Sequence, residues 1–366
     1  MSSFKFSISS ASESARVGRF VGPRDSFTTP VFMPVGTRGT IKAVLATQIE
    51  QIGFEVVLGN TYHLMLRPGV ETIQSLGGLH GFTGWKRNML TDSGGYQVMS
   101  LGATYSDKGA VFRSIYDGSI HEVTPERATL LQENIGADIA MVLDVCTNLP
   151  AGRDEVARAM ELTHSWAKRA RSAKTRNDQA QFGIVQGGVE QDLRRESAQF
   201  ISSIGFEGLA IGGLAVGESR EAMLESIDSV MKDLPTDVPR YLMGVGDPIG
   251  VIEAISRGVD MFDCVAPSRV ARHGQAMTFE GKLHLKNLKF ARDSRPIEDD
   301  CPCVACQRFP RALIRHLVTV GEPSGGTLLT LHNLTFMYRL VERARQSIRS
   351  GTLNALAGSI RAAWSN

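Results

Sequence analysis

Short apolar runs alternate with longer amphipathic stretches over most of the chain. The apolar runs are typical of buried strands, and they fall at 31–35, 55–59, 89–91, 139–143, 181–185, 209–212, 241–243 and 259–262. The stretches between them predict helices at 46–52, 70–76, 125–135, 153–175, 190–204, 220–231 and 247–256.

Eight strand–helix alternations predict an α/β fold, a closed parallel (β/α)8 barrel rather than an open sheet. Eight such units occupy about 250 residues, and the chain has 366. Two runs that precede the repeat, at 4–9 and 15–21, predict an N-terminal β-hairpin at the edge of the fold.

A polar side chain or a glycine stands at the end of nearly every predicted strand. Because the carboxyl ends of the strands in a (β/α)8 barrel surround the active site, one ligand-binding mouth is expected there. These strand-end residues are Asn60, Asp92, Asp144, Gln186, Gly213, Gly244 and Asp263.

The carboxylates of this set, Asp92, Asp144 and Asp263, allow two kinds of chemistry. Two of them could flank a glycosidic bond, one as nucleophile and one as proton donor and acceptor, while the third binds the ligand. Alternatively, their oxygens could hold Mg²⁺. The residues come from different strands, so their spacing leaves both readings open.

Tyr96 and Met243 flank the same mouth and could sandwich a flat ligand, although each alone also fits core packing.

The segment after Asp263 is basic. Pro267 predicts a turn, and a basic loop with Arg269, Arg272 and His273 follows it. A carboxylate with cations just beyond it suits chemistry on an anionic ligand. The alternative is an aspartate that only satisfies loop amides.

The net charge of +2 does not by itself indicate a nucleic-acid partner. Its distribution is uneven, since residues 307–350 hold seven Arg against two Glu. Such a run usually marks a solvated helix face, and a phosphate-facing surface is also allowed.

No apolar run reaches the ~18 residues of a membrane span and no signal-peptide core is present, which predicts a cytoplasmic protein with no membrane partner.

Three of the five cysteines are clustered, as Cys301, Cys303 and Cys306. The odd count and the clustering favour a metal site over disulfides. With one distant imidazole, the three thiols supply the four ligands of a closed, structural Zn²⁺ site. The spacing leaves both His332 and His316 open as the fourth ligand, and three reduced thiols with an unrelated histidine are the alternative.

Nine segments carry a resemblance to a known family. They occur in order along the chain, the resemblance covers about residues 10 to 350, and the chain closely resembles bacterial-type tRNA-guanine transglycosylases, the queuine tRNA-ribosyltransferase family. The segments are FMPVGTRGTIKA (32–43), LGNTYHLMLRPG (58–69), LTDSGGYQVMSL (90–101), FGIVQGG (182–188), GGLAVGE (212–218), MGVGDP (243–248), MFDCVAPSRVARHGQA (261–276), CPCVAC (301–306) and LHN (331–333).

The resemblance implies an irregular (β/α)8 barrel with a C-terminal zinc-binding subdomain. We expect the catalytic region at 1–290, the zinc-binding subdomain with the Arg-rich helices at 291–350, and a tail at 351–366 that completes the domain. The implied enzyme is a pentosyltransferase that exchanges guanine at wobble position 34 of GUN-anticodon tRNAs for preQ1, a 7-deazaguanine on the route to queuosine. Double displacement through a covalent enzyme–RNA intermediate and a homodimer are also implied.

The resemblance implies a role for individual residues. Asp263 matches the nucleophile and Asp92 the general acid/base. The zinc ligands match Cys301, Cys303, Cys306 and His332. Positions that hold the base match Asp92, Ser93, Gly94, Gly95, Tyr96, Asp144, Cys146, Gln186, Gly213, Leu214, Val216 and Met243. Positions that contact RNA match Gly244, Val245, Gly246, Asp247, Pro248, Ser268, Arg269, Val270, Ala271 and Arg272.

Departures from the family pattern are few. Val145 stands where many relatives have Glu, and His273 where many have Asn, while Cys146 and Val216 imply a pocket sized for preQ1. A non-catalytic RNA-binding paralogue would lack one of the two catalytic aspartates, and both are present. A barrel glycosidase acting on small nucleosides is a further alternative, which would not need zinc-pinned basic helices.

Overall fold

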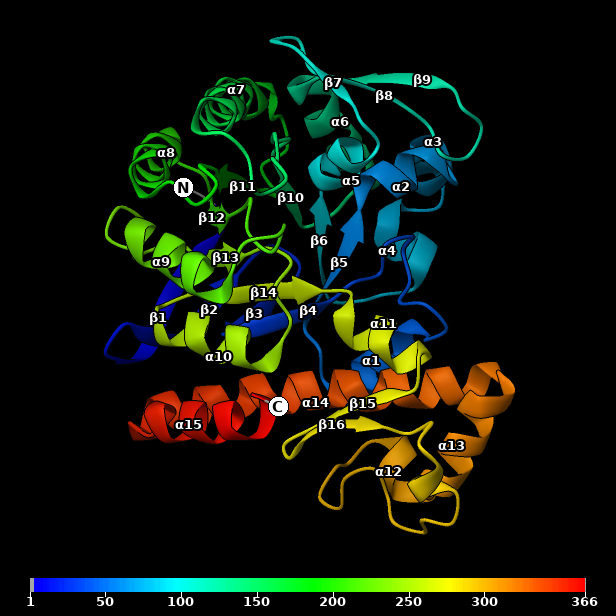
Figure 1. Ribbon diagram of the computed structural model, residues 1–366. Helices are drawn as coiled ribbons and strands as arrows, with labels where there is room; N and C mark the ends of the chain where they lie inside the picture. Colours follow the sequence, from blue (N-terminus) through cyan, green and yellow to red (C-terminus); the bar gives the residue numbers. More distant parts are fainter. Residues whose placement is uncertain (1–2, 366) are drawn as a thin grey trace.

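Eight parallel strands form the barrel in the computed structural model, which describes residues 3–365 (Figure 1). Neighbouring strands pair in the order β4-β14-β13-β12-β11-β10-β6-β5. A parallel bridge between Val35 and Leu58 joins the two ends of this sheet and closes the barrel. All eight predicted strands are confirmed: β4 (Val31–Pro34), β5 (Val56–Asn60), β6 (Asn88–Asp92), β10 (Ile139–Met141), β11 (Ala180–Val185), β12 (Gly208–Ile211), β13 (Arg240–Leu242) and β14 (Met261–Cys264).

The predicted helices are also confirmed, with ends that shift by one or two residues. They are α1 (Ala46–Ile52), α3 (Val70–Ser75), α6 (Pro125–Ile135), α7 (Arg153–Ala173), α8 (Gln191–Ile204), α9 (Arg220–Val230) and α10 (Pro248–Ser256). Four further helices have six or seven residues each, too few for a helical period to show in the sequence. These are α2 (Thr61–Leu66), α4 (Gly78–Thr83), α5 (Gly95–Ser100) and α11 (Ala266–Arg272).

The predicted N-terminal hairpin belongs to a three-stranded antiparallel sheet of β1 (Lys5–Ser12), β2 (Ala15–Val21) and β3 (Ser26–Thr29). The sheet covers the amino ends of the barrel strands. Phe20 packs edge-on against Phe182 of β11, with ring centroids 6.0 Å apart. Arg16 makes a buried ion pair with Asp260, which directly precedes β14. The sheet therefore leaves the carboxyl ends of the barrel strands open.

A second small antiparallel sheet lies between β6 and β10 in the chain and was not predicted. It consists of β7 (Thr104–Tyr105), β8 (Ala110–Arg113) and β9 (Ile120–Val123). Phe112 and Val123 pack in one cluster with Tyr62 of α2, Val98 of α5 and Trp166 of α7. Because α2 and α5 begin where β5 and β6 end, this sheet stands beside the carboxyl-terminal mouth of the barrel (Figure 1).

The C-terminal region begins with the hairpin β15 (Gln275–Thr278) and β16 (Gly281–His284), followed by η1 (Leu288–Phe290), α12 (Val304–Arg308) and α13 (Arg311–Val320). The long helix α14 (Pro323–Ser350) then runs beneath the barrel, and α15 (Leu353–Trp364) packs beside it (Figure 1). Leu329 of α14 packs in the subdomain core, whereas Phe336 and Leu340 pack in the barrel core. One helix therefore contributes to both cores. The domain boundaries expected at residues 290 and 350 stay predictions.

Most arginines of the 307–350 run make contacts within the chain. Five of them donate hydrogen bonds to main-chain carbonyls or to carboxylates of neighbouring segments: Arg311, Arg315, Arg339, Arg343 and Arg345. These bonds tie α13 and α14 to the segments that they cover. Within residues 3–365, no helix has the length and apolar character needed to cross a membrane.

Candidate active site and metal centre

The carboxyl ends of the barrel strands open into a cavity of about 340 Å³. It is the mouth expected from the strand-end residues. The predicted site residues that line it are Asp92, Tyr96, Asp144, Cys146, Gly213, Leu214, Val216, Met243, Gly244, Asp263 and Arg269.

Asp263 lies half-buried in β14 with two donors on one carboxylate oxygen. Tyr241 Oη donates to Oδ1 at 2.6 Å, and Gly244 N donates to the same oxygen at 2.7 Å. Burial raises the pKa of Asp263, and these two hydrogen bonds oppose the rise. Among the described residues no donor bonds to Oδ2, so one oxygen of a well-oriented carboxylate keeps its lone pairs available.

Asp92 ends β6 beside Asn60, which ends the neighbouring strand β5. Asn60 Nδ2 donates to Asp92 Oδ2 at 2.8 Å. Burial, together with the negative charges of Asp144 and Asp263, raises the pKa of Asp92 to about 7. A carboxyl group with such a pKa can take up and release a proton near neutral pH, as a general acid/base must.

Asp144 and Gln186 form a buried polar pair. Gln186 Nε2 donates to Asp144 Oδ2 at 2.6 Å. Burial raises the pKa of Asp144 to about 6, and this hydrogen bond limits the rise. Two glycines make room for the pair. A Cβ at Gly95 would lie 2.3 Å from Asp144 Oδ1, and one at Gly213 would lie 2.2 Å from Gln186 Oε1.

The turn after β6 presents Tyr96 at the cavity mouth. Ser93 is buried, and Gly94 has φ 92°, where a Cβ would lie 2.5 Å from Tyr62 Cβ. Only glycine fits this turn, because both the backbone angle and the close approach exclude a side chain. Tyr96 follows in the first turn of α5 with 52% of its surface exposed, available to a flat ligand.

The first segment predicted to contact RNA, residues 244–248, connects β13 to α10. Asp247 is exposed, and its Oδ1 accepts a hydrogen bond from Gly250 N, which caps the helix. Val245 and Gly246 are buried. A Cβ at Gly246 would lie 2.3 Å from Cys264 Cβ, so this connection packs directly against the end of β14.

The second such segment is helical, and the prediction of a turn and a basic loop was wrong. Residues 268–272 lie in α11, whose first turn accommodates Pro267 because the missing N–H has no partner there. Arg269 is exposed and lines the cavity, whereas Arg272 bonds to Ser268 O within the helix. Ala271 is buried in the subdomain core, so the helix rests on that core with Arg269 toward the mouth.

The three clustered cysteines and His332 are buried, and their ligand atoms lie within 4.8 Å of one another, a group able to hold a metal ion. His332 Nε2 lies 2.9 Å from Met277 O. A carbonyl only accepts, so Nε2 carries the proton and Nδ1 is left as a free ligand atom toward the thiols. His316 is exposed on α13 and lies outside this group, so it is not the fourth member.

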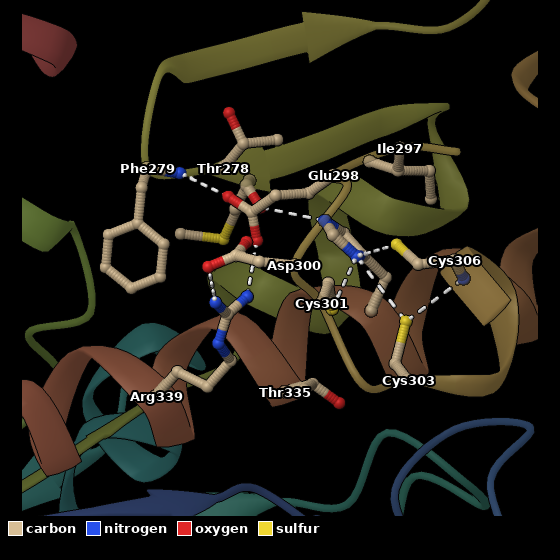
Figure 2. Close-up of polar contacts among 12 residues, drawn as sticks. Thr278, Phe279, Ile297, Glu298, Asp300, Cys301, Cys303, Cys306, Thr335 and Arg339 are labelled. Atoms are coloured by element: carbon tan, nitrogen blue, oxygen red, sulfur yellow. Dashed lines mark hydrogen bonds and ion pairs between the residues drawn. The ribbon is translucent and has the colours of Figure 1, made fainter. Parts of the chain in front are cut away.

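Figure 2 shows the cysteines on a segment that Arg339 ties to α14. Arg339 donates to Glu298 and to Asp300, both at 2.6 Å, and Glu298 accepts from Phe279 N at 2.8 Å. These bonds order the chain immediately before Cys301 and connect it to the hairpin of β15 and β16.

The chain matches known proteins over nearly its whole length. A family model described as queuine tRNA-ribosyltransferase matches residues 10–366. The chain belongs to the queuine tRNA-ribosyltransferase family. A curated queuine tRNA-ribosyltransferase of Thermus thermophilus is 50% identical over 353 residues, 96% of this chain and 92% of the relative. The relative of a Ruegeria species is 48% identical over 355 residues, 96% of this chain and 94% of the relative. The relative of Zymomonas mobilis is 46% identical over 368 residues, 99% of this chain and 95% of the relative.

Three residues missed by the sequence reasoning position the site of this queuine tRNA-ribosyltransferase family member. Asn60 was noted as a strand end, but its contact with Asp92 was not foreseen. Tyr241 lies two residues before Met243, and in extended backbone this spacing places both side chains on the same face. The spacing could therefore have indicated that Tyr241 lies at the site. Glu218 accepts hydrogen bonds from the amides of Ala215 and Val216, and so fixes the loop after β12.

Arg194 of α8 is a fourth missed residue. Its guanidinium is fully buried and donates to the carbonyls of Gly188 and Gly212, both at 2.7 Å. Burial lowers the pKa of Arg194 to about 10. The sequence did hold a signal for this role, because Arg194 shares a helix face with Ser197 and Ala198. That face must point inward, so an arginine on it must be buried. This cation joins the loop after β11 to the loop after β12.

Proposed function

We propose that this chain is a tRNA-guanine transglycosylase of queuosine biosynthesis, which exchanges guanine at wobble position 34 of GUN-anticodon tRNAs for preQ1. The observation that carries the proposal is the pair of aspartates at one cavity mouth in unlike environments. Asp263 is oriented by two donors, and Asp92 has its pKa raised to about 7. Double displacement at a glycosidic carbon needs such a nucleophile and such an acid/base.

In the first half-reaction, an oxygen of the Asp263 carboxylate bonds to C1′ of the ribose, and the bond from C1′ to guanine breaks. Asp92 supplies the proton that the departing guanine needs. In the second half-reaction, Asp92 removes a proton from preQ1, whose nitrogen attacks C1′ and displaces Asp263. The two inversions together retain the configuration at C1′. Burial raises the pKa of Asp263, and the hydrogen bond from Tyr241 opposes this rise and so favours the ionised form that a nucleophile requires.

The base-binding roles follow from the same cavity. Asp144 and Gln186 offer oxygen and amide groups to the edge of a purine-like base, and main-chain groups at Gly213 and Leu214 extend this edge. Tyr96 and Met243 would lie against the faces of the base. Ser93, Gly94 and Gly95 form the turn that carries Tyr96. Cys146 and Val216 limit the space at the mouth, which favours the small preQ1 over queuine.

The metal of the Cys3His group is Zn²⁺ in this proposal, and its role is structural. Zinc held by thiolates at about 2.3 Å and imidazole at about 2.1 Å places sulfur and nitrogen roughly 3.6 Å apart in a tetrahedron. The distances from His332 Nδ1 to the three sulfurs are 3.3, 3.6 and 3.6 Å, which fits. A bound Zn²⁺ would offset two of the three thiolate charges and lock the cysteine segment onto α14.

The partner is the anticodon loop of a tRNA. Guanine must leave the base stack to reach Asp263, and extrusion costs little in a single-stranded loop. The RNA would then run over residues 244–248 and α11, where Arg269 is exposed beside the cavity. A homodimer in the cytoplasm completes the proposal and rests on the family resemblance.

Incubation with unmodified tRNA and labelled guanine tests the reaction. We expect incorporation of label into tRNA with a GUN anticodon, competition by preQ1, and an RNA adduct on denaturing gels that Asp263→Asn abolishes. Adduct formation by that variant would refute the nucleophile. Tight RNA binding without any exchange would instead support a non-catalytic RNA-binding paralogue, and exchange on free nucleosides alone would support a small-nucleoside glycosidase.

A further inference from the structure

Two arginines converge on one tyrosine ring beside the cavity. Arg67 Cζ lies 4.5 Å from the ring centroid of Tyr116, and Arg38 Cζ lies 5.5 Å from the same centroid. His63 Nδ1 is 3.1 Å from Tyr116 Oη, so the ring is held at its hydroxyl end as well. We call Arg38, Arg67, Tyr116 and His63 the Arg–Tyr cluster.

The cluster adjoins the mouth of the active-site cavity. Arg38 directly follows Thr37, which lines that cavity. Asn60 also lines it, and its side chain accepts a hydrogen bond from His63 N at the start of α2. Tyr116 lies in the connection between β8 and β9, the small sheet that stands over α2. Loops after two barrel strands and one inserted hairpin thus supply the cluster on the catalytic face.

The positive charge of the cluster is not neutralised within the chain. Both Arg38 and Arg67 are exposed, and across residues 3–365 no carboxylate lies within ion-pair distance of either guanidinium. Asp117 is the next residue after Tyr116, but its carboxylate accepts from the amide and the hydroxyl of Ser119. Most arginines of α13 and α14 differ, because they are bonded to the rest of the chain.

Two guanidinium groups without a carboxylate partner that lie against one aromatic ring are a site for an anion. The ring orients the guanidinium planes and reduces their freedom, so less entropy is lost when each donates to phosphate oxygens. An anticodon loop whose base enters the cavity must pass its backbone across the surrounding rim, which brings phosphates to this position.

We propose that the Arg–Tyr cluster binds a phosphate of the tRNA backbone outside the exchanged nucleotide, on the side of the cavity formed by β4 and β5. The inference rests on the proposed function and extends it, since it assigns a second RNA contact on the rim away from α11. It predicts that the cluster contributes to RNA affinity and to its salt dependence, and not to binding of the free base.

The test compares Arg38→Gln, Arg67→Gln and the double variant with Arg195→Gln. Arg195 is exposed on α8 and is not part of the cluster. Fluorescence anisotropy would measure binding of an anticodon stem-loop of GUN sequence between 50 and 200 mM salt. The double variant should weaken binding about 10-fold or more and reduce the slope of log K against log salt by about 0.7, because one lost phosphate contact on a single strand removes about 0.7. Tyr116→Ala should weaken binding, and Tyr116→Phe should weaken it less.

The kinetics give an independent measure. We expect KM for tRNA to rise, while kcat at saturating tRNA and KM for preQ1 stay as in the unaltered protein. An affinity and a salt slope equal to those of Arg195→Gln would overturn the proposal. A double variant that loses self-association at an unchanged salt slope would overturn it too, and would assign the cluster to a protein interface. Failure of the unaltered protein to exchange guanine would refute the proposed function instead, and the salt slope would still decide the cluster.

Discussion

Tyr241 Oη and Asp263 Oδ1 are 2.6 Å apart, across the paired strands β13 and β14. Tyr241 is in register with Met261, and Asp263 lies two residues further on the same face. Barrel register therefore places a buried phenol beside the carboxylate. The bond fixes the orientation of the carboxylate and opposes the effect of burial on its pKa.

Tyr241→Phe removes the donor and keeps the ring. Without the bond, the pKa of Asp263 should rise further, because the hydroxyl lowers it in the unaltered protein. A higher proportion of protonated, non-nucleophilic Asp263 moves the acid limb of the pH profile of kcat/KM to higher pH, and kcat should fall about 10-fold or more. Tyr338→Phe on α14 is the matched control, since that residue lies away from the cavity. An acid limb that does not move would contradict this role.

Asp92→Asn should abolish base exchange and raise stability at alkaline pH. The pKa of Asp92 is raised to about 7 in the folded protein, against about 3.9 in an unfolded chain. The folded state therefore holds this proton more tightly, and its contribution to stability is full below about pH 4 and lost as pH rises through 7. The variant should gain about 1–3 kcal/mol over the unaltered protein at pH 8 and nothing at pH 4. Thermal unfolding at both pH values measures this, with the exposed Asp237→Asn expected to be neutral.

Gly95→Ala should displace Asp144, because the added Cβ would lie 2.3 Å from Asp144 Oδ1. Overpacking of this kind costs about 1–3 kcal/mol of stability. We expect KM for the free base to rise about 10-fold or more as the pair with Gln186 is disturbed. Gly152→Ala is the control, since φ there is −69° and nothing lies within 4 Å of the new Cβ. Equal KM values for the two variants would show that Asp144 does not recognise the base.

Arg194→Met should loosen the two loops that hold Gln186 and Gly213. The buried guanidinium donates to carbonyls of both loops, and its loss leaves those acceptors unpaired. We expect the free energy of unfolding to fall by about 2–5 kcal/mol and KM for the base to rise. Urea unfolding and steady-state kinetics measure the two effects. The exposed neighbour Arg195→Met should stay within about 0.5 kcal/mol of the unaltered protein.

Cys303→Ser should reduce the zinc content of the purified protein and lower its melting temperature, because a structural zinc site contributes directly to folding. Elemental analysis should find one zinc per chain in the unaltered protein and in Cys264→Ser, whose thiol lies at the active-site cavity. Equal zinc contents in both variants would contradict the Cys3His site.

The sequence determined the elements and the location of the chemistry. A strand of Val, Ile and Leu and a helix with one apolar face are local patterns, so all eight barrel strands and seven of the helices between them were predicted. The helix α14 was expected only as Arg-rich helices within 291–350, and α15 only as a tail at 351–366. The missed elements α2 and β7 have six and two residues, too few for their period to repeat clearly in the sequence. Asp92, Asp144 and Asp263 stand at strand ends, and strand ends gather at one mouth in any closed parallel barrel.

Only the tertiary structure decided what each side chain meets. Spacing left His316 and His332 open, the resemblance favoured His332, and the packing of α14 brings only His332 to the thiols. The arginine run looked like a charged surface, yet most of it bonds to the chain, whereas Arg38 and Arg67 gave no signal at their separate positions. Contacts of this kind depend on strand register and on burial, and a pKa depends on both. Neither the strand register nor the burial of a side chain is encoded in the local order of residues.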